Sequence, residues 1–229
     1  MFSIVIPLYN EAKNIEILLT EIYVSLKKYK NFEIILVNDF SSDNTLEVIK
    51  NIQKKNHITL VNNSKNQGQS YAIHKGITIS KNNLIVTIDG DGQNNPKDIP
   101  RLLELFFANK DVSLVGGIRF KRKDSNIKIL SSKIANAIRS KILNDDCLDT
   151  GCSLKVFEKN IFLNFPYFNG IHRFLPALFK GYGYKTLFIN VDHRHRKEGK
   201  SNYGTIDRLY RGIIDIIKVR KIIKKNISK

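Results

Sequence analysis

Short apolar runs alternate with longer amphipathic stretches along the first half of the chain. The runs SIVIP, FEIILV, ITLV, LIVTI and VSLVGG are rich in Val and Ile, which is typical of buried strands. Apolar positions recur at helical spacing between them, over about residues 12–29, 43–54, 70–80 and 97–109. Continuous apolar strands that alternate with helices pack as a mostly parallel sheet covered on both faces. The pattern therefore predicts an α/β fold.

The second half of the chain follows this pattern less regularly. It predicts a helix over about residues 127–143, a strand near 154–157, a helix near 172–180 and a strand at KTLFINV. After Gly204, apolar residues form one stripe of a final, strongly basic helix. Such a stripe is typical of a helix on a membrane surface, and equally of a helix packed on the domain with a solvated basic face. We expect a domain over residues 1–203 and a basic amphipathic helix over residues 204–229.

Polar segments follow three of the predicted strands, at residues 7–11, 38–43 and 89–93. Parallel sheets of this kind bind ligands at the carboxyl ends of their strands. Because those ends meet along one edge, the three segments predict a single ligand site.

The pentapeptide DGDGQ, residues 89–93, suggests the chemistry of that site. Mg²⁺ and Mn²⁺ prefer oxygen ligands and usually take one or two carboxylates together with nucleotide phosphates. Asp89 and Asp91 supply two carboxylates at a strand end, while Gly90 and Gly92 lack side chains that would block a diphosphate. A simple acidic turn is the alternative. An EF-hand loop is excluded because its sixth and twelfth positions are not Gly and Glu.

The charge of the chain points to anionic partners. Lys and Arg outnumber Asp and Glu by 38 to 21 in 229 residues, which gives a net charge of +17. This favours nucleic acid, anionic membranes or phosphorylated substrates, although a lysine-rich composition explains part of the excess. Two cysteines are too few for a disulfide framework, and we find neither an export signal nor the about 20 apolar residues of a membrane-spanning helix.

Four sequence blocks carry a resemblance to a known family. They are IVIPLYNE (residues 4–11), ILVNDFSSDNT (35–45), VTIDGDGQNNP (86–96) and DHRHRKEGKSNYG (192–204). With them the chain resembles glycosyltransferase family 2 enzymes, particularly the dolichol- or polyprenyl-phosphate sugar synthases, over nearly its whole length. DTGCSLKVF (149–157) and HRFLPAL (172–178) are similar to further blocks of that subfamily. The resemblance implies a GT-A type fold and inverting transfer of a sugar from a GDP- or UDP-sugar to a polyprenyl phosphate.

The resemblance also implies which residues bind the donor. These are Pro7, Tyr9, Glu11, Asp39, Gln67, Gly68, Asp89 and Gly90. The Asp39 carboxylate can accept an imide N–H from uracil or guanine. Its alternative role is in a turn that begins the next helix, where the following Ser and Asp residues are good caps. Gly68 could equally be a turn glycine.

The implied metal ligands are Asp89, Asp91 and Gln93, which would hold Mg²⁺ or Mn²⁺ against the donor diphosphate, with Asp91 as the catalytic residue. The metal would offset charge on the leaving nucleoside diphosphate. The implied cradle for the lipid phosphate consists of Arg119, Lys128, Ser132, Arg194, Arg196 and Ser201. A solvated basic loop is the alternative for this last set. A phosphate acceptor is already a nucleophile, so no catalytic base is required.

Three rival functions remain open from the sequence. Transfer to a glycan hydroxyl would need a carboxylate base, for which the clustered candidates are Asp145, Asp146 and Asp149. A non-catalytic polyanion binder would use the net charge, and a nucleotidyltransferase would need a phosphate loop that PLYNEAKN does not offer. We expect a cytoplasmic enzyme, peripheral on the membrane or held by a separate membrane protein, with no nucleic-acid partner.

Overall fold

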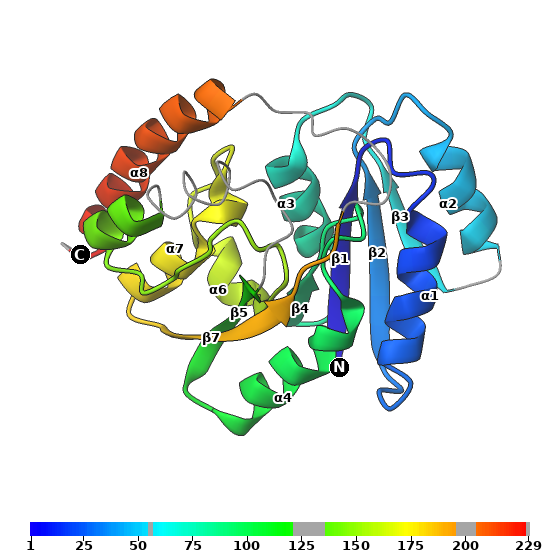
Figure 1. Ribbon diagram of the computed structural model, residues 1–229, viewed down its shortest axis with the longest axis horizontal. Coiled ribbons are helices and arrows are strands. Elements are labelled where there is room, and N and C mark those ends of the chain that lie inside the picture. The colour runs from blue at the N-terminus through cyan, green and yellow to red at the C-terminus, as the bar shows by residue number, and fades with distance from the viewer. Residues whose placement is uncertain (55–56, 121–135, 196–204, 228–229) are drawn as a thin grey trace.

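Figure 1 shows the computed structural model, which describes residues 1–54, 57–120, 136–195 and 205–227. One seven-stranded sheet crosses the molecule in the order β3-β2-β1-β4-β6-β5-β7. The strands are β1 Phe2–Leu8, β2 Phe32–Asn38, β3 Ile58–Asn62, β4 Leu84–Thr87, β5 Val112–Phe120, β6 Lys155–Glu158 and β7 Lys185–Asp192. Of these strands of the described residues, only β6 runs antiparallel to its neighbours, β4 and β5, so the prediction of a mostly parallel sheet is confirmed.

Helices cover both faces of the sheet. Their bounds are α1 Ile15–Ser25, α2 Thr45–Gln53, α3 Gln69–Ile79, α4 Ile99–Ala108, α6 Lys159–Leu163, α7 Leu175–Gly181 and α8 Thr205–Ile227, with short 3₁₀ turns η1 Pro96–Asp98 and η2 Ile171–Arg173. Residues 136–143 are also helical. α1, α2 and α4 pack into one apolar cluster, and α3, α6, α7 and α8 pack into the other on the opposite face.

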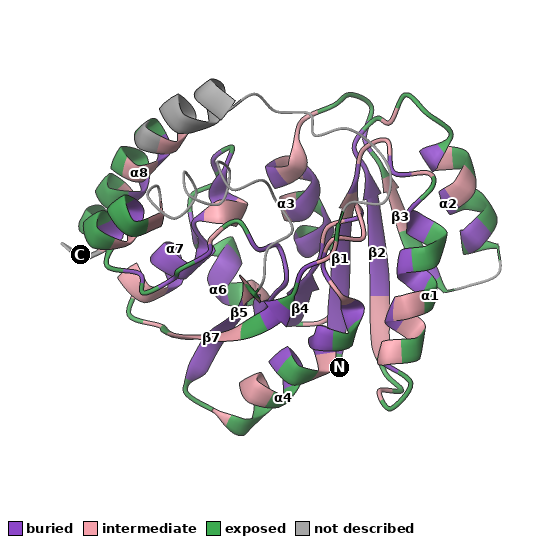
Figure 2. Cartoon of the chain, in the orientation of Figure 1, coloured by how far each residue is buried: buried purple, intermediate pink, exposed green. Residues whose placement is uncertain are grey.

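The alternation of side chains along β1 explains this two-sided core. Ile4, Ile6 and Leu8 belong to the first cluster, whereas Val5 belongs to the second. Successive residues of a strand point to opposite faces, so a strand covered on both faces is apolar throughout. Figure 2 shows the result as central strands that are buried beneath helices with exposed outer surfaces.

Most predicted elements exist, with shifted ends. α1 begins at Ile15 rather than near residue 12, because the Glu11 carbonyl accepts the Asn14 and Ile15 N–H groups and forms a turn there. The helix predicted over 97–109 is η1 followed by α4, and the one predicted over 172–180 is η2 followed by α7. The short helix α6 was missed. Of the helix predicted over 127–143, only 136–143 lies within the described residues.

The described part of α8 packs on the domain with one face. Val219 is fully buried, and Ile216, Ile222 and Ile223 contact the second apolar cluster. Ile223 fills the space that a side chain at Gly181 would need. Among the described residues, no helix has the length and apolarity needed to span a membrane.

Candidate active site

The loops after β1 and β2 are joined by hydrogen bonds. The Asn10 backbone N–H donates to Ser41 Oγ at 3.0 Å, and the Ser42 N–H donates to Asn10 Oδ1 at 2.8 Å. Asn10 and Phe40 both adopt positive φ, 58° and 60°, so each loop turns sharply as its strand ends. These contacts place the first two sequence blocks side by side at the carboxyl edge of the sheet.

Asp39 organises the loop that leads into α3. Its Oδ1 accepts hydrogen bonds from Asn63 Nδ2 at 2.8 Å and from the Gln67 N–H at 3.0 Å, and its Oδ2 accepts the Gly68 N–H at 2.7 Å. The side chain is buried, and Oδ2 keeps a second lone pair. Asp39 is thus a structural anchor for residues 63–68, a role that the sequence analysis did not anticipate. The contact with the start of α2 is made by Asp43 instead, whose carboxylate accepts the N–H of Thr45, the first residue of that helix.

The amino end of α3 meets the DGDGQ segment. Gly68 precedes the helix with φ 87°, a conformation that favours glycine, and its N–H is the one bound by Asp39. Gln69, the first helical residue, donates its side-chain amide to Asp89 Oδ1 at 2.7 Å. The helix therefore begins directly beside Asp89, and the backbone N–H groups of its first turn lie at the carboxyl edge of the sheet, which we call the rim.

Asp89 and Asp91 form an electrostatically strained pair. Burial, followed by the nearby negative charge of Asp91, raises the pKa of the Asp89 carboxyl to about 7, against the stabilising effects of Ser153, Lys155 and Arg119. The charge of a divalent cation would offset both effects and favour the two ionised carboxylates, which fits a Mg²⁺ or Mn²⁺ site. Among the described residues, no larger cluster of His, Cys, Asp or Glu has metal-binding geometry. The remaining ligands would then come from a substrate.

The two glycines of this segment have different roles. Gly92 adopts φ 70° with open space around it, so the backbone conformation explains glycine there. A side chain on Gly90, in contrast, would lie 2.3 Å from Leu8 Cδ2. Gly90 is buried, and it permits close packing of the β1 and β4 ends, so the prediction that it clears the way for a diphosphate is not supported by its position.

Residues of the block at 149–157 contact the DGDGQ segment and the asparagine that follows it. The Asp89 N–H donates to Ser153 Oγ at 3.1 Å, and Ser153 Oγ donates to Asn94 Oδ1 at 2.7 Å. Lys155, opposite Thr87 in the ladder, is buried and donates Nζ to the Cys152 carbonyl. Its charge lowers the pKa of Asp89 and so favours the carboxylate. The sequence analysis did not single out Ser153 or Lys155.

The third and fourth sequence blocks pair as a short antiparallel bridge. Asn94 lies opposite His193, and the Arg194 N–H donates to the Gln93 carbonyl at 2.9 Å. The Gln93 N–H in turn donates to Asp91 Oδ1 at 3.1 Å. The bridge fixes the DGDGQ loop on the segment that ends β7.

Arg194 lies beside this loop but is held by an acid. Its Nη1 contacts both Glu21 carboxylate oxygens at 2.7 and 2.9 Å, and its Nη2 donates to Asn95 Oδ1. Together with Asp91 and Gly92 it lines a small hollow against α1. The predicted acceptor residue is therefore close to the metal pair, and Glu21 fixes its orientation.

The other predicted cation within the described residues is also ion-paired. Arg119 makes a two-point contact with Asp149, Nε to Oδ2 at 2.7 Å and Nη2 to Oδ1 at 2.8 Å. The remaining acceptor residues of the prediction, Lys128, Ser132, Arg196 and Ser201, lie outside the described residues.

The three carboxylates proposed as bases for a hydroxyl acceptor are all paired with cations. Asp145 is fully buried and bonds Arg139, Asp149 is buried and bonds Arg119, and Asp146 bonds Lys180. Two of them are shielded from solvent, and each is neutralised by a partner. The geometry does not favour any of them as the base for a glycan hydroxyl.

His172 of the HRFLPAL block connects to the same helix start. Ser70 Oγ accepts the Gly170 N–H at 2.7 Å and lies 2.7 Å from His172 Nδ1, in a hydrogen bond whose direction depends on the tautomer of the ring. Burial, reinforced by the charges of Arg173 and Lys155, lowers the pKa of His172 to about 3. His172 is thus a neutral hydrogen-bond donor at physiological pH.

Three further predicted donor-binding residues lie at the end of β1 and on the loop that follows it. Pro7 is within the strand, and Tyr9 is partly exposed beyond it. Glu11 is buried and accepts Asn14 Nδ2 at 2.7 Å, and its N–H donates to Thr45 Oγ1. The loop thus brings these residues to the same edge as Asp39.

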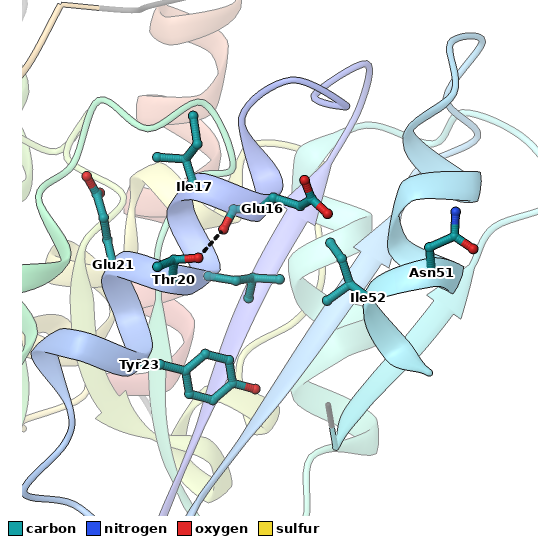
Figure 3. A pocket seen from close by; sticks show the side chains of 8 residues that line it. Glu16, Ile17, Thr20, Glu21, Tyr23, Asn51 and Ile52 are labelled. Carbon is teal, nitrogen blue, oxygen red and sulfur yellow. Dashed lines mark hydrogen bonds between the residues drawn. The ribbon is translucent and has the colours of Figure 1, made fainter. Parts of the chain in front are cut away.

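A further groove of the described residues lies elsewhere. It has a volume of about 460 Å³ between α1 and α2 and is lined by Glu16, Ile17, Leu19, Thr20, Glu21, Tyr23, Asn51 and Ile52 (Figure 3). Its charged residues are both acidic, which disfavours a diphosphate. We assign it no role in donor binding.

The sheet order, the two-sided helical cover and the acidic pair at a strand end define a GT-A type glycosyltransferase fold. The chain belongs to glycosyl transferase family 2, whose sequence profile matches residues 3–165. Both predictions are confirmed.

Two curated relatives are similar over most of this chain. Undecaprenyl-phosphate 4-deoxy-4-formamido-L-arabinose transferase of Photorhabdus laumondii is 35% identical over 204 residues, which are 88% of this chain and 62% of that protein. Dodecaprenyl-phosphate galacturonate synthase of Rhizobium johnstonii is 33% identical over 223 residues, 95% of this chain and 65% of that protein. The chain therefore spans less than two thirds of the length of these relatives.

Solved structures share the fold at low sequence identity. Glucosyl-3-phosphoglycerate synthase from Mycobacterium tuberculosis, crystallised with Mn²⁺, UDP and phosphoglyceric acid, superposes with a TM-score of 0.71 at 16% identity, covering 96% of this chain and 78% of that one. Mannosyl-3-phosphoglycerate synthase from Rubrobacter xylanophilus gives 0.73 at 14%, covering 96% and 73%.

Proposed function

We propose that this protein transfers a sugar from a nucleotide-sugar donor to a polyprenyl phosphate, with inversion at the anomeric carbon. The observation that carries the proposal is the pair of neighbouring carboxylates, Asp89 and Asp91, at the sheet edge, where Gln69 at the amino end of α3 is hydrogen-bonded to Asp89. Two adjacent carboxylates repel each other when both are ionised, and a metal ion would relieve that repulsion. The N–H groups at the start of a helix favour an anion such as the diphosphate bound to that metal. The relatives named as polyprenyl-phosphate sugar transferases supply the acceptor class.

The donor would lie along the rim from the β1 loop to DGDGQ. The second lone pair of Asp39 Oδ2 would accept an imide N–H of the base, and Tyr9 and Glu11 would contact the nucleoside. Because Asp39 already anchors residues 67 and 68, the donor's base and the start of α3 would be fixed by one carboxylate. Both UDP and GDP carry a suitable imide N–H.

Asp89 and Asp91, with Gln93 beside them, would hold Mg²⁺ or Mn²⁺. A bound ion supplies charge stabilisation to the leaving nucleoside diphosphate. Gln69 orients the Asp89 carboxylate through its 2.7 Å hydrogen bond, and the Gln93 N–H orients that of Asp91. These contacts fix both carboxylates before any ligand arrives, which lowers the cost of assembling the site.

A phosphate acceptor suits a site without an accessible base. A phosphate monoester carries a charge of about −1.5 to −2 near pH 7, so its oxygen attacks without losing a proton. The ion pairing of Asp145, Asp146 and Asp149 disfavours the rival reaction on a glycan hydroxyl, which needs proton removal. Attack in line with the departing diphosphate inverts the sugar. Since the acceptor is a lipid, the protein would work at a membrane surface, peripherally on its cytoplasmic face.

A radiolabel-transfer assay tests the proposal. Mn²⁺, a panel of labelled UDP- and GDP-sugars and undecaprenyl phosphate in detergent are incubated with the protein, and label entering the organic phase is measured. Asp91→Ala should abolish transfer while folding is retained. Asp111→Ala is the matched control, because Asp111 is exposed and pairs with Lys185 at the opposite edge of the sheet.

Wild-type turnover by Asp91→Ala would remove the metal pair from the mechanism. Label that stays in water while one nucleotide sugar is bound or hydrolysed would overturn the lipid acceptor and retain the donor half of the proposal.

A further inference from the structure

The described part of α8 has two chemically different faces. The inner face packs on the domain through Val219, Ile216, Ile222 and Ile223. The outer face leaves Ile214 and Ile217 exposed, at 47% and 53% of their surface. A helix that served only to cover the core would not need isoleucines on its solvent side.

Basic residues surround the exposed isoleucines. The Lys218 ammonium lies 5.1 Å from the centroid of the buried Phe168 ring, so this side chain turns toward the domain. Lys221, Lys224 and Lys225 are all exposed. At 100° per residue they fall on the same side of the helix as Ile214 and Ile217. We call this set of two isoleucines and three lysines the outer face of α8. The acidic residue Asp215 points the other way and pairs with Arg173 at 2.9 Å.

A second short helix leaves isoleucines exposed near α8. Residues 136–143 expose Ile138 at 54% and Ile142 at 40%, with exposed Lys141 between them. Leu143, on its inner side, belongs to the same apolar cluster as Val219 of α8. Figure 1 places both helices at the same end of the molecule, beyond α7.

We infer that the outer face of α8 docks the protein on an anionic lipid bilayer, with the helix at 136–143 adding apolar contact. Isoleucines enter the boundary between headgroups and acyl chains, and the surrounding lysines meet the anionic headgroups. A second copy of this chain is a poorer occupant, because association through this face would bring two sets of lysines together. Nucleic acid would use the lysines and leave the isoleucines in water.

The inner side of α8 is also connected to the candidate active site. Asp215 of α8 bonds Arg173, the neighbour of His172, which in turn contacts Ser70 at the start of α3. The helix that carries the outer face is thus connected, through its inner side, to the start of α3 beside Asp89. In this respect the inference rests on the proposed function, since a polyprenyl phosphate would be presented from the same surface. Bilayer binding itself requires no sugar transfer and is measured without it.

Vesicle co-sedimentation tests the inference on the full chain. Vesicles of phosphatidylcholine alone are compared with vesicles containing about one third phosphatidylglycerol, at physiological salt. Each lysine at an anionic surface is worth about a fivefold change in partitioning. Lys221→Gln/Lys224→Gln/Lys225→Gln should therefore reduce binding to the anionic vesicles on the order of a hundredfold, and Ile214→Ser/Ile217→Ser should also reduce it at unchanged charge.

Matched variants separate this face from the overall charge. Lys27→Gln/Lys28→Gln/Lys30→Gln removes the same charge from exposed lysines that follow α1, and Val24→Ser removes an exposed apolar residue there. Neither should change binding by more than a few-fold. Thermal unfolding checks that each variant is folded.

Several outcomes would overturn the inference. Equal loss in the α1 set would mean that net charge alone attracts the vesicles. Binding that survives Ile214→Ser/Ile217→Ser would exclude insertion, and no binding to anionic vesicles would exclude the bilayer. Concentration-dependent self-association that the α8 variants abolish would assign the face to a second copy. If variants that lose vesicle binding still transfer sugar to a detergent-solubilised acceptor, the docking surface and the proposed function are separately established.

Discussion

Replacing Asp89 with Asn should stabilise the metal-free protein at alkaline pH. The side chain is largely buried and lies near Asp91, and together these raise its pKa from 3.8 to about 7. The folded protein therefore binds a proton at this position more tightly than the unfolded chain does. The contribution of the protonated carboxyl to the free energy of unfolding is therefore fully present at pH values below the pKa of Asp89 in the unfolded chain. It is lost as the pH rises through about 7, the pKa in the folded protein.

The magnitude follows from the two pKa values. Each tenfold change in acidity is worth about 1.4 kcal/mol, so an ionised Asp89 costs the folded protein about 4 kcal/mol at pH 8. Residual solvent contact at the side chain reduces this to roughly 2 to 4 kcal/mol. Asn keeps the shape and can still accept the Gln69 amide without carrying charge. The stabilising difference should shrink below pH 7 and be nearly absent at pH 4.

Urea unfolding in EDTA at pH 8, 6 and 4 measures this difference. Asp89→Asn should unfold at higher urea than the wild type at pH 8, with the two curves converging at pH 4. Added Mn²⁺ at pH 8 should stabilise the wild type and leave the variant nearly unchanged. Glu16→Gln, an exposed change on α1, should shift unfolding by less than about 0.5 kcal/mol. A variant less stable than the wild type at pH 8 without metal would refute the electrostatic argument.

Three further predictions test the scaffold of the site. Gly90→Ala should destabilise the protein by about 1 to 3 kcal/mol in urea unfolding, because the new methyl group overlaps a β1 leucine, and an unchanged midpoint would contradict this. Asp145→Ala should cost about 3 to 5 kcal/mol by leaving the buried Arg139 guanidinium unpaired, whereas the double change with Arg139→Met should recover most of it. The imidazole ¹⁵N resonances of His172 should report a neutral ring at pH 5, where an ordinary histidine is charged, and Ser70→Ala should change the balance of its two tautomers by removing the hydroxyl beside Nδ1.

The rim of the sheet could be predicted because strand ends are local features of a sequence. Apolar runs of four to six residues mark the strands, and the polar residues behind them must lie at the carboxyl edge of a parallel sheet. The structure joins those segments by named contacts, from Asn10 with Ser41 to Gln69 with Asp89. Helix ends were less accurate, since the turn at Glu11 depends on a backbone contact that no residue type signals.

Partners across the fold could not be predicted in the same way. Asp39 is read from sequence as a ligand of a base, yet its carboxylate anchors residues 67 and 68, about 28 positions further along the chain. Lys155 reaches Asp89 only because β6 inserts antiparallel beside β4. The alternation of strands and helices in a sequence does not indicate which strand will insert between two others. The charged residues that such a strand brings to the site therefore cannot be predicted from the sequence.

The ion pairs around the site bear on how it could bring two anions together. A strongly basic sequence suggests that phosphates are attracted by mobile, solvated side chains. In the structure, however, Arg119 and Arg194 are each held by a carboxylate in a two-point contact. A guanidinium fixed in this way has one orientation and loses little side-chain freedom when a further acceptor arrives, which a solvated lysine cannot match. The acids Asp149 and Glu21 would then act by orienting the positively charged guanidinium groups rather than by accepting protons.

An exchange such as Asp149→Asn should accordingly weaken phosphate use by loosening Arg119 while leaving the pH dependence of transfer unchanged. A proton-accepting Asp149 would instead shift that dependence, so a pH profile of transfer separates the two roles.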